Sequence, residues 1–303
     1  MRVASALAPG HISGFFQVCD EAKELEHKGS RNCGPCIEAG VITEVSVRPA
    51  SRKGIKIVIN GEEAPWAKTT STVVEKILRL IPEPVEVTVS HEVKVPIGAG
   101  YGASGAGALG TALALSEALN MHLPREQLVT IAHIAEVTCL TGLGDVGAQA
   151  RGGLVIGLEP GAPPYGRWDQ IQIPSDIRVV CCTLGQLLTE EILRDEELRK
   201  RSRELGGYAL RKLMKDLTPK NFMLVSQEFS ESLGLLDDEL RALTRAAIKA
   251  GAIGASQVML GRAVFALTRE KTLEKVKQAF VDICGPEAVL VTDIDTEGAK
   301  LLR

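Results

Sequence analysis

The chain has 303 residues, of which 24% are charged and 45% hydrophobic, and its net charge is −3. This length and composition are typical of a globular protein with room for two domains. The charge gives no electrostatic footprint for nucleic acid or an anionic membrane, and no apolar run reaches the ~18 residues that span a bilayer. The N-terminus is too short and too soon broken for a signal peptide. We therefore expect a cytoplasmic enzyme.

The first 100 residues are predicted to consist mostly of strands. Residues 85–90 alternate strictly between apolar and polar side chains, and the isoleucines of residues 55–59 alternate in the same way. Residues 41–47 are a weaker third strand. A short helix is expected over residues 72–80.

Two cysteines in this part, Cys33 and Cys36, have the spacing of a redox pair or of half a zinc site. A redox pair normally opens a helix after a strand, and no second pair of cysteines or histidines stands nearby. The seven cysteines are odd in number and scattered, which argues against a disulfide framework. We expect these two to be incidental thiols in a loop.

Helices dominate the middle of the chain, and strands and helices then alternate. A turn-rich stretch, residues 159–166, is the expected boundary between domains at 1–160 and 161–303. Before it we expect helices at 104–119 and 125–139, a short helix opening at Asp145, and a buried strand at 152–158. After it we expect a strand at 177–184, three or four helices over 190–250, a strand at 257–267, a helix at 272–283 and a strand at 288–294. This order predicts an α+β second domain, possibly of the split βαβ type.

Glycines crowd around Ser104 in the stretch from Pro96 to Gly110, and an alanine-rich helix follows. Glycine lets the backbone approach a ligand closely, and a helix start offers unpaired N–H groups with a partial positive charge. The junction therefore suits phosphate, although a tight turn into a packed helix is the alternative. It is no P-loop, because no Gly-Lys pair occurs in the chain. The dinucleotide pattern fits only loosely, because several strands precede the loop and no acidic residue follows about 20 residues later.

Three acceptors are placed to form a site with this loop: Ser104, Glu136 and Asp145. Glu136 lies near the end of an otherwise apolar helix, and Asp145 follows nine residues later, across a second glycine-rich turn. Phosphoryl transfer needs hydroxyl and carboxylate oxygens for a metal ion and a carboxylate that accepts the proton of the attacking alcohol. The alternatives are that Ser104 is only a helix cap, Glu136 a surface residue, and Asp145 the N-cap of the next helix.

With these features the chain resembles the GHMP kinases. Pro96-Ile-Gly-Ala-Gly-Tyr-Gly-Ala-Ser-Gly-Ala106 is similar to their ATP loop, Pro-x-x-x-Gly-Leu-Gly-Ser-Ser-Ala-Ala, and Ala8-Pro-Gly10 matches the start of their first motif. The resemblance covers the whole chain. It implies their α+β fold, with an N-terminal ribosomal-protein-like α/β domain built on a left-handed βαβ unit and a C-terminal ferredoxin-like α+β domain.

Within this superfamily the chain is most similar to the archaeal pantoate kinases. Five separated segments carry this similarity: Pro9-Gly-His-Ile-Ser-Gly-Phe-Phe16, Gly29-Ser-Arg31, Ala132-His-Ile-Ala-Glu136, Thr141-Gly-Leu-Gly-Asp-Val146 and Met259-Leu-Gly-Arg-Ala-Val-Phe265. The resemblance implies ATP- and magnesium-dependent phosphorylation of the primary hydroxyl of pantoate to 4-phosphopantoate, in coenzyme A biosynthesis. A homodimer is expected from the family alone.

The resemblance also implies the roles of the site residues. Ser104 and Glu136 would bind magnesium and the triphosphate, and Asp145 would be the base. The ATP loop would comprise Pro96, Gly98, Gly100, Gly102, Ala103, Ser104, Gly105 and Ala106. The candidates for binding pantoate are Ser30, Arg31, His133, Arg151 and His11.

Three departures from the family pattern qualify these roles. Residues 250–257 replace the family's third glycine-rich motif, which leaves the C-terminal wall of the phosphate site undefined. His11 stands where many relatives have a lysine, so an electrostatic partner of Asp145 is either missing or replaced. Gly157 stands where relatives tend to have an arginine, so Arg151 or Arg31 would serve instead. With aromatic residues at only 4%, the sequence names no adenine pocket.

Two alternative functions stay open at this point. One is a GHMP kinase for another small alcohol, such as homoserine or mevalonate. The other is a nucleotide-binding regulator that kept the ATP loop but lost catalysis. The presence of Ser104, Glu136 and Asp145 together argues against the regulator.

Overall fold

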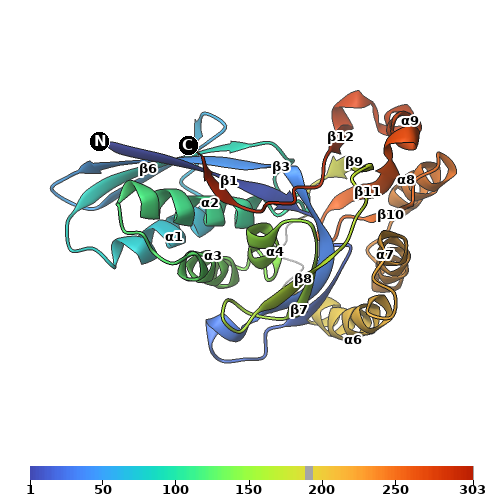
Figure 1. Cartoon of the computed structure of the whole chain (residues 1–303), viewed down its shortest axis with the longest axis horizontal. Coiled ribbons are helices and arrows are strands. Elements are labelled where there is room, and N and C mark those ends of the chain that lie inside the picture. Colours follow the sequence, from blue (N-terminus) through green and yellow to red (C-terminus); the bar gives the residue numbers. More distant parts are fainter. Residues whose placement is uncertain (188–193, 303) are drawn as a thin grey trace.

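A computed structural model describes residues 1–187 and 194–302 of the chain (Figure 1). Within these residues the N-terminal part forms a nine-stranded sheet. Its strands are β1 (Arg2–His11), β2 (Phe15–Cys19), β3 (Gly29–Pro49), β4 (Gly54–Ile59), β5 (Glu62–Glu63), β6 (Val85–Val93), β7 (Leu154–Glu159), β8 (Arg167–Ile171) and β13 (Lys300–Leu302). The main order is β13-β1-β3-β6-β4-β5, while β2 and β7 pair with β3 and β8 pairs with β7.

Strand β3 is 21 residues long and belongs to both ends of this sheet. Its second half pairs with β1 and β6, and its first half pairs with β2 and β7. The expected strand at 41–47 is therefore only part of β3. Cys33 and Cys36 lie within its first half and not in a loop, so that expectation is wrong. Both thiols are fully buried, and burial raises their pKa well above the usual value.

Four helices cover one face of the sheet (Figure 1): α1 (Lys68–Leu78), α2 (Ala103–Ala118), α3 (Arg125–Cys139) and α4 (Asp145–Arg151). Strands β4 and β6, which flank α1 in the chain, pair in parallel and complete a βαβ unit. Helix α2 is buried along nearly its whole length. Its small residues let it lie close to the sheet, because a Cβ at Gly110 would be only 2.6 Å from the hydroxyl of Thr43. The expected helices at 104–119 and 125–139 are confirmed.

The C-terminal part is a four-stranded antiparallel sheet with helices α6 (Glu196–Leu213), α7 (Pro219–Leu233), α8 (Asp238–Lys249) and α9 (Leu273–Cys284). Its strands are β9 (Ile177–Gly185), β10 (Gly254–Gln257), β11 (Arg262–Arg269) and β12 (Val289–Thr292). The order β10-β11-β9-β12 is that of a ferredoxin-like split βαβ fold, as the sequence predicts. Short 3-10 helices occupy Leu25–His27, Glu270–Thr272 and Pro286–Ala288. The start of the expected helical stretch, residues 190–193, lies outside the described residues.

The expected strand at 257–267 is wrong, because the chain turns in its middle. Strand β10 ends at Gln257, Leu260 takes a left-handed conformation with φ 63°, and β11 begins at Arg262. The apolar run of residues 258–260 maintains the strand-like pattern through this turn. The structure therefore has an antiparallel β10–β11 hairpin where the sequence suggests one strand.

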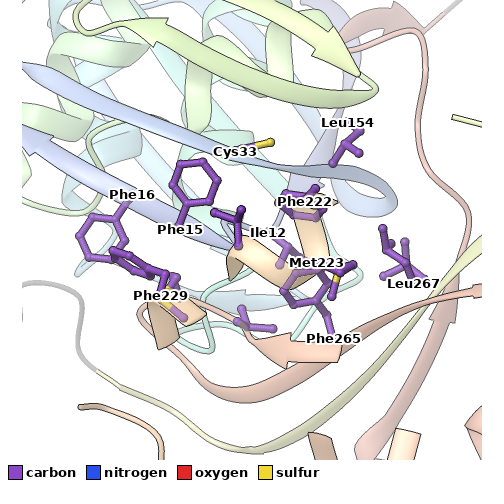
Figure 2. Packing of buried hydrophobic residues seen from close by; sticks show 14 of the residues in the cluster. Ile12, Phe15, Phe16, Cys33, Leu154, Phe222, Met223, Phe229, Phe265 and Leu267 are labelled. Carbon is purple, nitrogen blue, oxygen red and sulfur yellow. The ribbon is translucent and has the colours of Figure 1, made fainter. Parts of the chain in front are cut away.

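One apolar core joins the N-terminal sheet to the C-terminal part (Figure 2). Phe15 and Phe16 on β2 pack against Phe229 of α7, with ring centroids 6.2 and 5.6 Å apart. Phe222 of α7 packs against Phe265 of β11 at 6.1 Å. Burial of these large aromatic side chains stabilises the contact between the two parts of the chain.

Two segments beyond residue 160 belong to the first sheet. Strand β8 pairs with β7, and the C-terminal strand β13 returns to pair with β1, as Figure 1 shows beside the C-terminus. The division into 1–160 and 161–303 stays a prediction. Among the described residues, no helix is both long and apolar enough to cross a membrane.

Candidate active site

A cavity of about 990 Å³ opens where the glycine loop, the start of α1 and the turn between α3 and α4 meet. The start of β3 and the β10–β11 hairpin complete its walls. The hairpin contributes Met259 and Leu260, so this turn forms a C-terminal wall in place of residues 250–257.

The glycine loop owes its shape to three alternate glycines, Gly98, Gly100 and Gly102, with φ of 74°, 86° and 66°. These values lie in the left-handed region, where other residues are strained. Gly102 is the N-cap of α2, and no side chain caps the helix. The amide groups of the first turn of α2 are therefore left for a ligand, and an anion is favoured there.

Most of the predicted loop residues line the cavity, namely Gly98, Gly100, Gly102, Ala103 and Ser104. Pro96, Gly105 and Ala106 are not part of its lining. Ser104, the second residue of α2, does not cap the helix, and neither does Asp145, the first residue of α4. Glu136 is only 2% exposed and is not a surface residue. The structural alternatives considered for these three side chains therefore do not apply.

Ser104 and Glu136 belong to a compact group of oxygen atoms. The Ser104 hydroxyl donates to Glu136 Oε1 at 2.6 Å, and the Thr141 hydroxyl donates to the same oxygen at 2.6 Å. The Thr69 hydroxyl lies 2.9 Å from that of Thr141 and 3.3 Å from that of Ser104. The sequence reasoning missed Thr69 and Thr141, whose contacts with Ser104 and Glu136 bring α1 to the α3–α4 turn.

The electrostatics of Glu136 follow from its burial. Burial raises the pKa of this carboxyl to about 7, against the two hydroxyl donors that lower it, and the nearby charge of Asp145 raises it further. Its second oxygen, Oε2, is buried and has no hydrogen-bond partner. A Cβ at Gly142 would be 2.1 Å from Oε2, so a larger residue there would displace this oxygen.

This group of atoms fits a divalent cation that shares its ligands with a nucleotide. An unpartnered carboxylate oxygen and adjacent hydroxyls are the hard ligands that magnesium takes. Within residues 1–187 and 194–302, no cluster of three or more acidic, histidine or cysteine side chains could hold a metal ion by itself. Magnesium does not need such a cluster, because it usually keeps water and phosphate ligands.

The carboxylate of Asp145 is held by His11, the last residue of β1. Its Oδ1 lies 2.7 Å from His11 Nδ1, and His11 is fully buried. An ionised carboxylate only accepts, so the proton of this bond is on Nδ1. His11 is therefore the partner of Asp145 in this chain, in the place where many relatives carry lysine. It does not line the cavity, where it was predicted to bind substrate.

The predicted substrate residues separate into two groups. Ser30 lines the cavity close to Asp145, with Ser13 and Asn32, which the sequence reasoning missed. A Cβ at Gly144 would be 2.2 Å from Ser30 Oγ and 2.8 Å from Asn32 Nδ2. The Asn32 amide donates to the Ser13 hydroxyl at 3.2 Å. These side chains form a hydroxyl and amide surface beside the carboxylate.

The other three substrate candidates are not brought to the cavity. His133 is buried, its Nε2 lies 2.7 Å from the carbonyl oxygen of Lys28, and burial lowers its pKa. Arg31 pairs with Glu159, and the exposed Arg151 lies 3.7 Å from Asp169.

Another part of the cavity, called the α1 arm below, is lined by residues at and just before the start of α1 and by Ile97 of the glycine loop. Trp66 lines its mouth with 62% of its surface exposed, beside Lys68 and Ile97. His91 lies deeper in this arm, with Nδ1 2.9 Å from the Thr43 hydroxyl and Nε2 3.0 Å from that of Thr70. Burial lowers the pKa of His91 to about 4.

Comparison with known proteins identifies the family. The family model "GHMP kinases N terminal domain" matches residues 68–153. The chain is 35% identical to "Pantoate kinase" of Thermococcus kodakarensis, over 98% of each chain. The chain belongs to the pantoate kinase family of GHMP kinases. It is also 34% identical to "Pantoate kinase" of Methanocaldococcus jannaschii, over 88% of this chain and 93% of that one.

Solved structures agree with this GHMP kinase assignment. A "Phosphotransferase related to CoA biosynthesis pathway" superposes with a TM-score of 0.90 at 32% identity and covers 99% of both chains. More distant structures show the shared fold. One is homoserine kinase from Cytophaga hutchinsonii, with a TM-score of 0.69 at 17% identity over 100% of this chain and 98% of the other. The GHMP kinase fold predicted from the sequence is confirmed.

Proposed function

We propose that this protein transfers the γ-phosphoryl group of ATP to the primary hydroxyl of pantoate and so makes 4-phosphopantoate for coenzyme A biosynthesis. Three relatives named "Pantoate kinase", at 30–35% identity over most of their length, support this substrate. The observation that carries the chemistry is that Asp145 and Ser104 line one cavity beside the start of α2, with the buried Glu136 hydrogen-bonded to Ser104.

The nucleotide occupies the α1 arm, between α1 and the glycine loop. Its phosphates lie at the uncapped N-terminus of α2, where amide groups and the helix dipole favour negative charge. The apolar surface near Trp66 and Ile97 receives the nucleoside. Glu136 and Ser104 would hold magnesium, which would neutralise charge at the phosphates.

The acceptor lies at the other end of the cavity, against Asp145. His11 occupies Oδ1 of this carboxylate, so Oδ2, which faces Gly142 at the cavity, accepts the proton of the acceptor hydroxyl. As the proton moves to Oδ2, the hydroxyl oxygen bonds to the γ-phosphorus and ADP leaves. Ser30 and the Asn32 amide are the donors for the carboxylate of pantoate, because a carboxylate in a partly closed site needs hydrogen-bond donors.

The proposal includes the conditions in which the enzyme works. It uses magnesium as its metal and forms a homodimer, as its resemblance to the family implies, and its composition is that of a cytoplasmic enzyme. No nucleic acid or membrane takes part.

A substrate panel tests the proposal. ADP release is measured with pantoate, homoserine and mevalonate at equal concentrations, and 4-phosphopantoate is identified by mass spectrometry. We expect kcat/KM to be highest for pantoate. Preference for another alcohol would reject the substrate and leave a GHMP kinase, whereas ATP binding without turnover of any alcohol would favour the regulator.

A further inference from the structure

The hydroxyl groups around Glu136 have few donor protons, which limits the hydrogen bonds that they can form. An ionised carboxylate only accepts, and each serine or threonine hydroxyl has one proton to donate. The hydroxyls of Ser104 and Thr141 both donate to Glu136 Oε1. Thr69 therefore donates its own proton, and its nearer acceptor is the Thr141 oxygen at 2.9 Å. The order of donation is Thr69 to Thr141 to Glu136.

This arrangement treats the two oxygens of Glu136 differently. Oε1 accepts two short hydrogen bonds, whereas Oε2 accepts none and lies where a Cβ at Gly142 or Gly105 would come within 2.1 or 3.3 Å of it. A buried oxygen without a hydrogen-bond partner destabilises the folded state, so a cation that binds Oε2 would remove this cost. Because the Ser104 proton points at Glu136, the lone pairs of its oxygen are left for the same cation.

We propose that Thr69 and Thr141 are positioning residues for the magnesium site of the proposed kinase. Thr141, in the α3–α4 turn, holds Oε1 directly, and Thr69, on α1, holds Thr141 in place, so that Oε2 and the Ser104 oxygen are presented together. Neither threonine needs to touch the metal. The inference rests on the proposed function only in taking Ser104 and Glu136 as the metal ligands.

Nucleotide binding measured with and without magnesium tests this role separately from catalysis. Thr69 and Thr141 are replaced by valine, which keeps the branched shape and removes the hydroxyl, and by serine, which keeps the hydroxyl. Thr72→Val is the matched control, because Thr72 also lies on α1 but does not line the cavity, and its hydroxyl bonds to the Cys139 thiol and to none of the oxygens around Glu136. ADP affinity is measured by calorimetry with saturating magnesium and again with EDTA, and melting temperatures are recorded.

We expect Thr141→Val to weaken ADP binding about tenfold in magnesium, because it removes a hydrogen bond to a charged group. Thr69→Val should weaken it about threefold, because its bond is to a neutral hydroxyl. Binding in EDTA should change less than about twofold, and serine should restore the magnesium-dependent affinity.

Equal losses with and without magnesium would overturn the inference and leave the threonines a general structural role. Unchanged binding in magnesium would overturn it as well. If Thr141→Val does not fold, Thr69→Val and Thr141→Ser still decide the question. These measurements use ADP alone, so a failure to phosphorylate pantoate would reject the proposed function and leave this result standing.

Discussion

Replacing Asp145 with asparagine removes the proposed proton acceptor and hardly changes the volume of the side chain. Oδ1 lies 2.7 Å from the protonated Nδ1 of His11. Because Nδ1–H donates, the asparagine amide will turn its carbonyl oxygen to His11. Its NH2 group then takes the place of Oδ2, opposite the acceptor hydroxyl, where it can only donate. The variant should keep its fold and its nucleotide site.

The loss should appear in turnover and not in ATP binding. A positioned general base contributes about 10²–10⁴-fold, or about 3–5 kcal/mol of barrier. We expect kcat with pantoate to fall by this factor, measured by coupled ADP release, while calorimetric affinity for ADP with magnesium changes less than about twofold. A kcat within about tenfold of the wild type, with nucleotide binding intact, would refute the assignment of Asp145 as the base.

Three further predictions follow from buried or exposed groups at the cavity. The pKa of Glu136 is raised to about 7, and a cation binds only the ionised carboxylate, so binding of ADP with magnesium at pH 6 should release close to one proton. Calorimetry in buffers of different ionisation enthalpy measures this proton release, and Glu136→Gln should abolish it. His91 gains a proton near pH 6.5 in the unfolded chain but only near pH 4 in the folded one, so lowering the pH across this range should lower the free energy of unfolding. Urea unfolding should show a loss about 3 kcal/mol larger in the wild type than in His91→Asn. ATP should change the fluorescence of the protein, and Trp66→Phe should remove this signal while Trp168→Phe, the matched variant at the second tryptophan, retains it.

The sequence is most informative where structure is set by near neighbours. Helix α3 begins and ends where the apolar periodicity predicts, and the glycine loop has its left-handed residues at the three alternate glycines. Both features arise from local backbone preference, which can be judged from a short window of residues. The family resemblance supplied the rest of the fold, including the ferredoxin-like strand order that periodicity alone left open.

The contacts that shape the site could not be predicted in this way, because they join distant segments. His11 and Asp145 are 134 residues apart in the chain, and Thr69 and Thr141 are 72 apart. Local patterns do not report such pairs. The first half of β3 was missed for another reason, since Gly29, Gly34 and Pro35 are residues typical of turns and this stretch has no apolar–polar alternation.

The pairing of β13 with β1 has a consequence for how the chain folds. Strand β1 pairs with β3 on one side, and its other edge is closed by Lys300–Leu302, which are made long after β3. At ~5–20 residues per second, the ribosome needs roughly 13–50 s to travel from the end of β3 to β13. Throughout that interval β1 presents an open edge, which can pair with another chain. Variants that lack Lys300–Leu302 should therefore associate more readily, even though all of the candidate site residues are present.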